Sequence, residues 1–249
     1  MLSKAQIKYI HSLRLKKYRQ KYCRFFAEGV KVVDELLKEH FIRIDTLFAT
    51  EEWFEGKQQV SELHPETKIQ VISEQELKQL SNLDTPQQVF AICTIPTTTN
   101  FPKLSGHISL ALETIQDPGN LGTIIRIADW FGIENVICSP DCADTFSPKT
   151  IQATMGSIAR VRITEIRLEK IGERIENIPV FATTLRGKDI RTFSPVKEGI
   201  ILIGNEGHGL SEKAIQMATH CITIPRTGKA ESLNAAVAAG IICSQLLLL

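Results

Sequence analysis

Residues 107–131 read HISLALETIQDPGNLGTIIRIADWF and place an apolar run, a Gly-rich turn and an amphipathic stretch in succession. This order predicts a strand, a turn and a helix. Further short apolar runs, among them NVICS, IPVFATT, GIILIG and HCITIP, alternate with helical stretches up to residue 225. Continuous apolar strands that alternate with helices are typical of a parallel sheet covered on both faces. We therefore expect an α/β fold for this part of the chain.

The first 96 residues predict a second, smaller α/β domain. A basic helix is expected over residues 4–22, and residues 29–40 (GVKVVDELLKEH) carry apolar side chains at helical spacing. Three short strands are predicted in the apolar runs after this helix. Residues 96–106 (PTTTNFPKLSG) then contain two prolines and three consecutive threonines, which is typical of a linker. We predict a domain over 1–96, a linker over 97–106 and a second domain over 107–249.

The charge of the chain is nearly balanced but unevenly distributed. The net charge is +1, yet the first 24 residues hold eight Lys or Arg and no Asp or Glu. Such a segment suits contacts with nucleic-acid phosphates. A transit peptide is the alternative, although transit peptides are usually Ser-rich and this segment is not.

Composition also bears on location and on metal chemistry. The six cysteines form no C-x-x-C and lie mostly in apolar runs, which indicates buried thiols in a reducing compartment, the cytoplasm. The apolar C-terminus, 235–249, is short and interrupted by polar residues, so we expect a packed helix and no membrane span. The six histidines form no H-x-x-x-H pair, so no metal site is expected.

Three polar, Gly-rich segments follow predicted strands, at 117–126, 204–211 and 225–234. In parallel sheets, ligands bind at loops beyond the carboxyl ends of the strands. None of the three matches a phosphate loop, because G-x-G-x-x-G is missing after the first strand and Gly228-Lys229 is followed by Ala230. A G-x-S-x-G elbow is absent as well. The side chains that these segments offer favour hydrogen bonding and charge stabilisation over covalent attack.

The same three segments resemble, in order, the motifs of the SpoU (TrmH-like) family of RNA ribose 2'-O-methyltransferases in the SPOUT superfamily. DPGNLGTIIR (117–126) carries N-x-G-x-x-x-R, IGNEGHGLS (203–211) carries G-x-E-x-x-G-L-S, and IPRTGKAESLNAAVAAG (224–240) carries I-P…S-L-N-x-x-x-A. The resemblance covers residues 105–249. One departure is Arg226, where the third motif commonly has Met; it could reach RNA or alter the cofactor loop.

The resemblance implies a parallel-sheet domain tied in a deep trefoil knot, S-adenosylmethionine (SAM) as cofactor, and a homodimer. Residues 13–29 (LRLKKYRQKYCRFFAEG) are also similar to the start of the small ribosomal-protein-like domain that many members carry, which would bind the RNA substrate. The implied reaction is methylation of a ribose 2'-hydroxyl, most often in ribosomal RNA. A tRNA substrate and a non-catalytic RNA-binding or ribosome-assembly protein are the alternatives.

The resemblance also assigns residues to roles. The catalytic candidates are Asn120, Arg126, Glu206 and Asn234. The cofactor candidates are Thr183, Thr184, Ile203, Gly204, Asn205, Gly207, Ile224, Ser232, Leu233 and Asn234. The RNA candidates are Lys16, Lys17, Arg19, Arg126 and Ser157, the last in the segment SPKTIQATMGSIARV (147–161).

Several candidates have a plainer interpretation beside the functional one. Asn120, Ser232 and Asn234 are ordinary turn or helix-cap residues, and Glu206 suits a surface loop. Arg126 could act as a general base, but a guanidinium does not readily give up its proton and is better suited to stabilising an alkoxide and holding a phosphate. Three tyrosines, Tyr9, Tyr18 and Tyr22, could stack on unpaired bases or simply pack.

Overall fold

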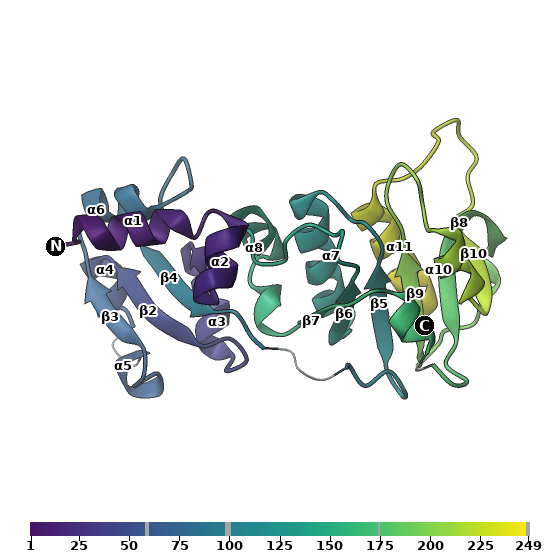
Figure 1. The fold of residues 1–249 in the computed structure, drawn as a ribbon, viewed down its shortest axis with the longest axis horizontal. Coiled ribbons are helices and arrows are strands. Elements are labelled where there is room, and N and C mark those ends of the chain that lie inside the picture. The colour runs from purple at the N-terminus through teal and green to yellow at the C-terminus, as the bar shows by residue number, and fades with distance from the viewer. Residues whose placement is uncertain (58–59, 98–100, 174, 248–249) are drawn as a thin grey trace. The chain divides into compact units, whose positions relative to one another are not determined.

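The computed structural model describes residues 1–57, 60–97, 101–173 and 175–247 (Figure 1). The chain forms two compact units. Unit 1 contains residues 1–97 and 146–160, and unit 2 contains residues 98–145 and 161–249. The segment 146–160, which the predicted boundaries assign to the second domain, therefore packs in unit 1.

Unit 1 is built on a four-stranded sheet in the order β1-β4-β2-β3. Its strands are β1 (Arg24–Glu28), β2 (Ile44–Ala49), β3 (Lys68–Val71) and β4 (Val89–Thr94). Its helices are α1 (Lys4–Ser12), α2 (Lys16–Tyr22), α3 (Val30–Lys38), α4 (Glu51–Glu55), α5 (Val60–Leu63), α6 (Glu74–Leu80), α8 (Pro148–Thr154) and the short η1 (Ser157–Ala159). The buried aromatic rings of Phe26, Phe48 and Phe90 form part of its core.

The predicted basic helix over 4–22 is two helices separated by a turn. The first, α1, begins at a capping box in which Ser3 and Gln6 bond to each other's backbone. The carbonyls of the turn that follows α1 are bonded by Arg19 from α2, whose Nη1 donates to the oxygens of Leu13 (2.7 Å) and Arg14 (2.8 Å). This buried cation satisfies carbonyls that a longer helix would bond itself, so the chain turns at residues 13–15.

Unit 2 is built on a six-stranded sheet in the order β10-β8-β9-β5-β6-β7. The strands are β5 (Ile108–Leu112), β6 (Asn135–Cys138), β7 (Arg162–Glu165), β8 (Val180–Asp189), β9 (Gly199–Ile203) and β10 (His220–Thr223). The helices are α7 (Pro118–Trp130), α9 (Glu169–Gly172), α10 (Glu212–Gln216), α11 (Ala235–Leu247) and the short η2 (Ile190–Thr192). Every neighbouring pair of strands is parallel, which confirms the predicted parallel sheet.

The strand order places the three motif segments at one edge of the sheet. After β5 the chain continues on one side through β6 and β7, then crosses to β8, β9 and β10 on the other side (Figure 1). The reversal between β5 and β9 is the kind of switch point at which α/β sheets bind ligands. The loops after β5, β9 and β10 are the three motif segments. The trefoil knot stays a prediction.

The helix expected at the C-terminus is α11, which packs beside α7 (Figure 1). A Cβ atom at Gly240 of α11 would lie 3.7 Å from the Ile127 side chain of α7, an ordinary contact distance. No helix among the described residues is long and apolar enough to cross a membrane.

Candidate functional site

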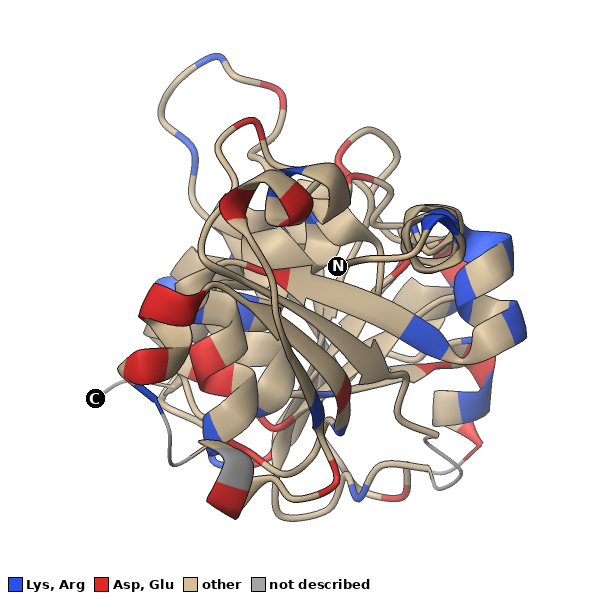
Figure 2. Ribbon diagram, turned by 90° about the vertical axis from the view of Figure 1, so that its left-hand side faces the viewer, with Lys and Arg blue, Asp and Glu red and all other residues tan. Residues whose placement is uncertain are grey.

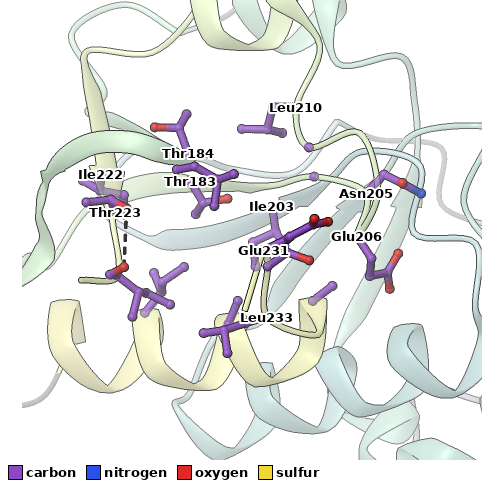
Figure 3. Close-up of a pocket in the computed structure, with 18 of the residues that line it drawn as sticks. Thr183, Thr184, Ile203, Asn205, Glu206, Leu210, Ile222, Thr223, Glu231 and Leu233 are labelled. Carbon is purple, nitrogen blue, oxygen red and sulfur yellow. Dashed lines mark hydrogen bonds between the residues drawn. The ribbon is translucent and has the colours of Figure 1, made fainter. Parts of the chain in front are cut away.

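A cavity of about 780 Å³ lies in unit 2 beside the middle of β8 and at the carboxyl ends of β9 and β10 (Figure 3). This volume is in the range of sites for drug-sized ligands and cofactors. Nine of the ten predicted cofactor residues line it, namely Thr183, Thr184, Ile203, Gly204, Asn205, Gly207, Ile224, Ser232 and Leu233. The tenth, Asn234, does not line the cavity.

One wall of the cavity comes from an irregularity in β8. Cys221 of β10 pairs with Ala182, but the next residue, Ile222, pairs with Lys188. Residues 183–187 of β8 therefore have no partner residue on β10, and Thr183 and Thr184 from this segment face the cavity (Figure 3). Gly187 allows β8 to pass close to the backbone of β10, because a Cβ atom at this position would lie 2.5 Å from the carbonyl carbon of Ile222.

The lining combines apolar walls with a few polar atoms. Ile203, Leu210 and Ile222 are buried and contribute apolar surface (Figure 3). The hydroxyl oxygen of Thr184 is buried and has no hydrogen-bond partner among the described residues. Buried polar atoms normally have a partner, so a polar ligand group fits here. Apolar walls with a few placed polar atoms are the usual composition of a cofactor site.

The loop 204–211 is folded tightly by its own backbone. The backbone amide of Asn205 donates to the backbone carbonyl of Gly209 at 3.2 Å, and the backbone amide of Gly209 donates to the backbone carbonyl of Asn205 at 2.9 Å. Gly204 allows this closure, since a Cβ atom there would lie 2.3 Å from the carbonyl carbon of Gly209. The Asn205 Oδ1 atom accepts from the amides of Gly207 and His208. The loop is therefore fixed without a ligand.

Two residues at the end of β5 anchor this loop, and the sequence reasoning missed both. The Glu113 carboxylate accepts from the amide and the hydroxyl of Ser211, both at 2.7 Å. The Thr114 carbonyl accepts from Asn205 Nδ2 at 2.9 Å. An acid directly after the first strand of the domain is the signal that could have indicated Glu113.

Thr114 itself adopts a left-handed backbone conformation, with φ +58°. This region is unfavourable for a β-branched residue and persists only where neighbours hold it. Here the Thr114 amide donates to Ser139 Oγ at 2.9 Å while its carbonyl accepts from Asn205. The strain therefore lies at the junction between β5 and the two motif loops.

Three of the four catalytic candidates are joined by hydrogen bonds. Asn234 Nδ2 donates to Asn120 Oδ1 at 2.9 Å, and Asn120 Nδ2 donates to Glu206 Oε1 at 2.5 Å. Each residue comes from a different motif, so this asparagine–glutamate chain ties the three loops together.

The plainer role as a cap also holds for one of these residues. Asn234 Oδ1 accepts from the amides of Ala236 and Val237 at the start of α11. Its side-chain nitrogen meanwhile bonds Asn120, so one side chain both caps a helix and joins two motifs. At the start of α7 the cap is Asp117, which accepts from the Asn120 amide at 2.9 Å.

Arg126, the fourth catalytic candidate, stands apart from this chain. It lies on an exposed face of α7, does not line the cavity, and forms no hydrogen bond or ion pair with any described residue. Six residues separate it from Asn120, which is about 240° of rotation on a helix, so the two side chains leave α7 in different directions. Its guanidinium is available to a ligand from solution.

Arg226, the departure from the third motif, bonds its own loop. Its Nη1 atom donates to the carbonyl oxygen of Ala230 at 2.7 Å. Arg226 and Ala230 both line the cavity, so this bond links two parts of the loop between β10 and α11.

The remaining RNA candidates lie in unit 1 and differ in exposure. Lys16 and Lys17 are exposed on α2. Arg19 is 3% exposed and bonds the end of α1, so its charge does not reach the surface. Ser157 is likewise buried, in η1.

A cysteine pair lies beside the first motif, and no sequence pattern indicated it. A hydrogen bond with Cys138 lowers the pKa of Cys142 to about 7, against the opposing effect of burial. The pKa of Cys138 is raised by the same bond and by burial. The Ile115 amide donates to Cys142 Sγ at 3.4 Å, which links this thiol to the β5–α7 loop. Among the described residues, no group of three or more His, Cys, Asp or Glu could hold a metal ion.

Family comparison agrees with this arrangement. Residues 107–244, more than half of the chain, match the model of the SpoU rRNA methylase family. The chain belongs to this family. Residues 4–91 match the MRM3-like substrate binding domain, and the two matches together span most of the chain.

Several relatives resemble this SpoU-family chain over nearly its whole length. The 23S rRNA (guanosine(2553)-2'-O)-methyltransferase RlmP of Bacillus subtilis is 31% identical over 92% of this chain and 91% of its own. A putative RNA methyltransferase of the TrmH family from Porphyromonas gingivalis has a TM-score of 0.88 at 35% identity, covering 99% of this chain and 98% of that one. An AdoMet-bound rRNA methyltransferase from Sinorhizobium meliloti has a TM-score of 0.86 at 32% identity, covering 99% and 95%.

Proposed function

We propose that this SpoU-family protein transfers a methyl group from SAM to a ribose 2'-hydroxyl of ribosomal RNA. The observation that carries the proposal is the hydrogen-bonded chain Asn234–Asn120–Glu206, which joins the three family motifs beside the cavity. Ribosomal RNA is favoured because full-length relatives such as RlmP are named as 23S rRNA 2'-O-methyltransferases.

The cavity suits SAM as cofactor. Ile203, Ile224 and Leu233 provide apolar walls for an adenine ring, and the backbone of the loop 204–211 offers amides and carbonyls to its edge. The unpartnered Thr184 hydroxyl can bond a polar group of the same molecule. When bound, SAM supplies a methyl group already activated for attack by an oxygen nucleophile.

The asparagine–glutamate chain would orient the polar groups of the site. Because Asn120 donates to Glu206 and accepts from Asn234, its amide can adopt one orientation only. The Glu206 carboxylate is thereby held at the carboxyl end of β9, where it can accept a hydrogen bond from a ribose hydroxyl. Such preorganised groups lower the barrier because they need no rearrangement during the reaction.

Arg126 would act on the RNA side. Its exposed guanidinium has no partner among the described residues and can form paired hydrogen bonds with a phosphate. Beside the 2'-oxygen it would stabilise the negative charge that develops as the hydroxyl attacks. A guanidinium does not readily give up its proton, which argues against a general-base role. Exposed Lys16 and Lys17 of unit 1 would add contacts to RNA phosphates.

We also propose that the protein is a cytoplasmic homodimer whose unit 2 is knotted, as the family resemblance implies. Exposed apolar side chains on α7 and α11 support the dimer. Trp130 at the end of α7 is 84% exposed and Val237 of α11 is 51% exposed, and a partner subunit could cover them. The six cysteines are free, which fits a reducing compartment.

The test is incubation with methyl-labelled SAM and ribosomal RNA, followed by alkaline hydrolysis. A 2'-O-methyl group blocks cleavage of the adjacent phosphodiester, so label is expected in alkali-resistant dinucleotides. Label confined to methylated bases would contradict the proposal. Label in tRNA but not in ribosomal RNA would indicate that the substrate is tRNA. No methyl transfer to either RNA would favour a non-catalytic RNA-binding protein.

A further inference from the structure

Unit 1 carries a cluster of three tyrosines at the junction of α1 and α2. Tyr9 meets Tyr22 edge-to-face, with ring centroids 5.1 Å apart and an interplanar angle of 73°. Tyr18 and Tyr22 are nearly parallel, with centroids 6.2 Å apart and an angle of 13°. The three rings therefore form one continuous aromatic surface, in which Tyr22 is the central member.

Lysine ammonium groups lie over this aromatic surface. Lys17 Nζ is 5.0 Å from the centroid of Tyr18, and Lys21 Nζ is 5.6 Å from the centroid of Tyr22. We call these three tyrosines and two lysines the tyrosine–lysine face. It combines flat rings with cations at the spacing of cation–π contacts.

The lysines around the tyrosine–lysine face have no acidic partner in the part of the chain that the structure describes. No carboxylate there forms an ion pair with Lys4, Lys8, Lys16, Lys17 or Lys21. Figure 2 shows Lys and Arg along these first two helices. By contrast, Arg24 at the end of the segment is paired with Asp45. The lysines of α1 and α2 therefore leave their positive charge available to a ligand.

The face is held in place by bonds to the rest of unit 1. Buried Arg19 bonds the carbonyls that end α1, which fixes the angle between the two helices. On the other side of the turn, Arg14 Nη2 donates to the Ser81 carbonyl at 3.0 Å. The rings can thus receive a ligand without losing much conformational freedom.

The three tyrosines differ in exposure and in orientation. Tyr22 is 38% exposed, while Tyr9 and Tyr18 are partly buried. Burial raises the pKa of Tyr9, which meets Tyr22 edge-to-face. Tyr22 is therefore the ring most open to a ligand, and Tyr18 extends its aromatic surface as the nearly parallel neighbour.

We propose that the tyrosine–lysine face binds unpaired nucleotides of the RNA substrate by stacking bases on Tyr18 and Tyr22. This inference rests on the proposed function for the choice of RNA. Aromatic rings reach the flat faces of bases only where the bases are unpaired, and the flanking lysines contact the connecting phosphates. A base-paired helix offers the lysines its phosphates but offers the rings no base face.

The experiment compares two RNA probes of equal length by fluorescence anisotropy with the full-length protein, without SAM. One is an unstructured 12-nucleotide strand and the other is that strand in a blunt duplex. Tyr22→Leu keeps an apolar side chain for packing but removes the ring. We expect it to weaken binding of the single strand about tenfold, in line with the loss of one base stack, and to leave duplex binding unchanged.

Two matched variants complete the design. Tyr22→Phe keeps the ring and is expected to bind both probes like the wild type. The rings of Tyr18 and Tyr22 are covered by Lys17 and Lys21 and not by Lys16, so Lys16→Ala is expected to weaken binding of both probes alike. Circular dichroism measures whether each variant is folded. If Tyr22→Leu is not folded, Tyr18→Leu takes its place.

The proposal is overturned if Tyr22→Leu and Tyr18→Leu bind the single strand like the wild type, or if they weaken both probes equally. Displacement of the strand by polyglutamate as readily as by unlabelled RNA would instead indicate an acidic protein partner. Because binding is measured without methyl transfer, a failure here is separate from a failure of the proposed function.

Discussion

The candidate functional residues of the two units are arranged in opposite ways. In unit 2, Asn120, Glu206 and Asn234 bond to one another, and the loop 204–211 is fixed to β5 by Glu113 and Thr114. In unit 1, the lysines of α1 and α2 have no acidic partner among the described residues. A fixed network suits one small ligand of defined shape, whereas unpaired cations suit a flexible polyanion.

Among the four catalytic candidates of unit 2, Arg126 is the one that lies outside the asparagine–glutamate chain. It belongs to the first motif with Asn120, yet it has no partner in the described part of the chain. By the same comparison, it behaves like the lysines of unit 1. This is why we assign it to the RNA and the bonded residues to the cofactor side.

The largest effect is expected from breaking the asparagine–glutamate chain. Asn120→Ala removes both hydrogen bonds and leaves Glu206 and Asn234 unconnected. Losing one preorganised group of a site commonly costs 100-fold or more in kcat, so methyl transfer should fall by about 100-fold. Initial rates with labelled SAM measure this.

Thr123→Ala is the matched control on α7, because the Thr123 hydroxyl bonds only the Gly119 carbonyl among the described residues. It should transfer methyl groups at nearly the wild-type rate. Equal activity of Asn120→Ala and Thr123→Ala would show that the asparagine–glutamate chain has no role in methyl transfer.

A smaller effect is expected from loosening the anchor of the loop 204–211. Glu113→Ala removes the acceptor for the Ser211 amide and hydroxyl. The loop would then lose order before SAM binds, and SAM affinity is expected to fall about tenfold with little change in kcat. Calorimetric titration with SAM measures the affinity. Glu113→Gln, which keeps an acceptor oxygen, should recover most of it, and a loss of kcat instead of affinity would contradict this role.

In unit 1, the expected effect is on RNA alone. Replacing Lys16 and Lys17 by Ala should weaken RNA binding several-fold and lower the slope of log affinity against log salt by about one per lysine. SAM affinity should be unchanged, because neither lysine lines the cavity. The measurement is RNA binding at four salt concentrations. A parallel loss of SAM affinity would break the proposed division between the units.

The smallest effect concerns the thiol beside the first motif. Because the pKa of Cys142 is lowered to about 7, its alkylation by iodoacetamide should rise with pH and reach half its maximum rate near pH 7. The bond with Ser139 contributes to this lowering, so Ser139→Ala should move the midpoint upward. Peptide mass spectrometry follows the reaction at this cysteine. An unchanged midpoint in Ser139→Ala would show that the bond with Ser139 does not lower the pKa of Cys142.

Much of the site in unit 2 could be predicted because a parallel sheet brings the carboxyl ends of its strands to one edge. The family resemblance assigned residues as distant in sequence as Thr183 and Leu233 to one cofactor site, and both line the cavity at these strand ends. The anchors were missed because Glu113 and Thr114 lie outside the motifs and act through specific side-chain geometry. No local pattern indicated that Thr114 would adopt a left-handed conformation.

Unit 1 was less predictable at the level of single residues. The basic composition predicted one helix over residues 4–22, where the structure has α1 and α2. A count of charges also cannot distinguish exposed Lys17 from buried Arg19. The difference depends on the carbonyls at the end of α1, which only the turn at 13–15 brings within reach of Arg19. In the same way, the packing of 146–160 in unit 1 depends on long-range contacts that no sequence pattern showed.

The central claim is that the bonded residues of unit 2 hold the motif loops together beside the cofactor cavity, while unpaired Arg126 serves the RNA. The most direct test is SAM titration of Arg126→Ala together with single-turnover methyl transfer to ribosomal RNA. We predict SAM affinity within about twofold of the wild type and transfer reduced by at least about 100-fold. A variant that loses SAM affinity in proportion to its activity would contradict the account, because Arg126 would then belong to the cofactor site.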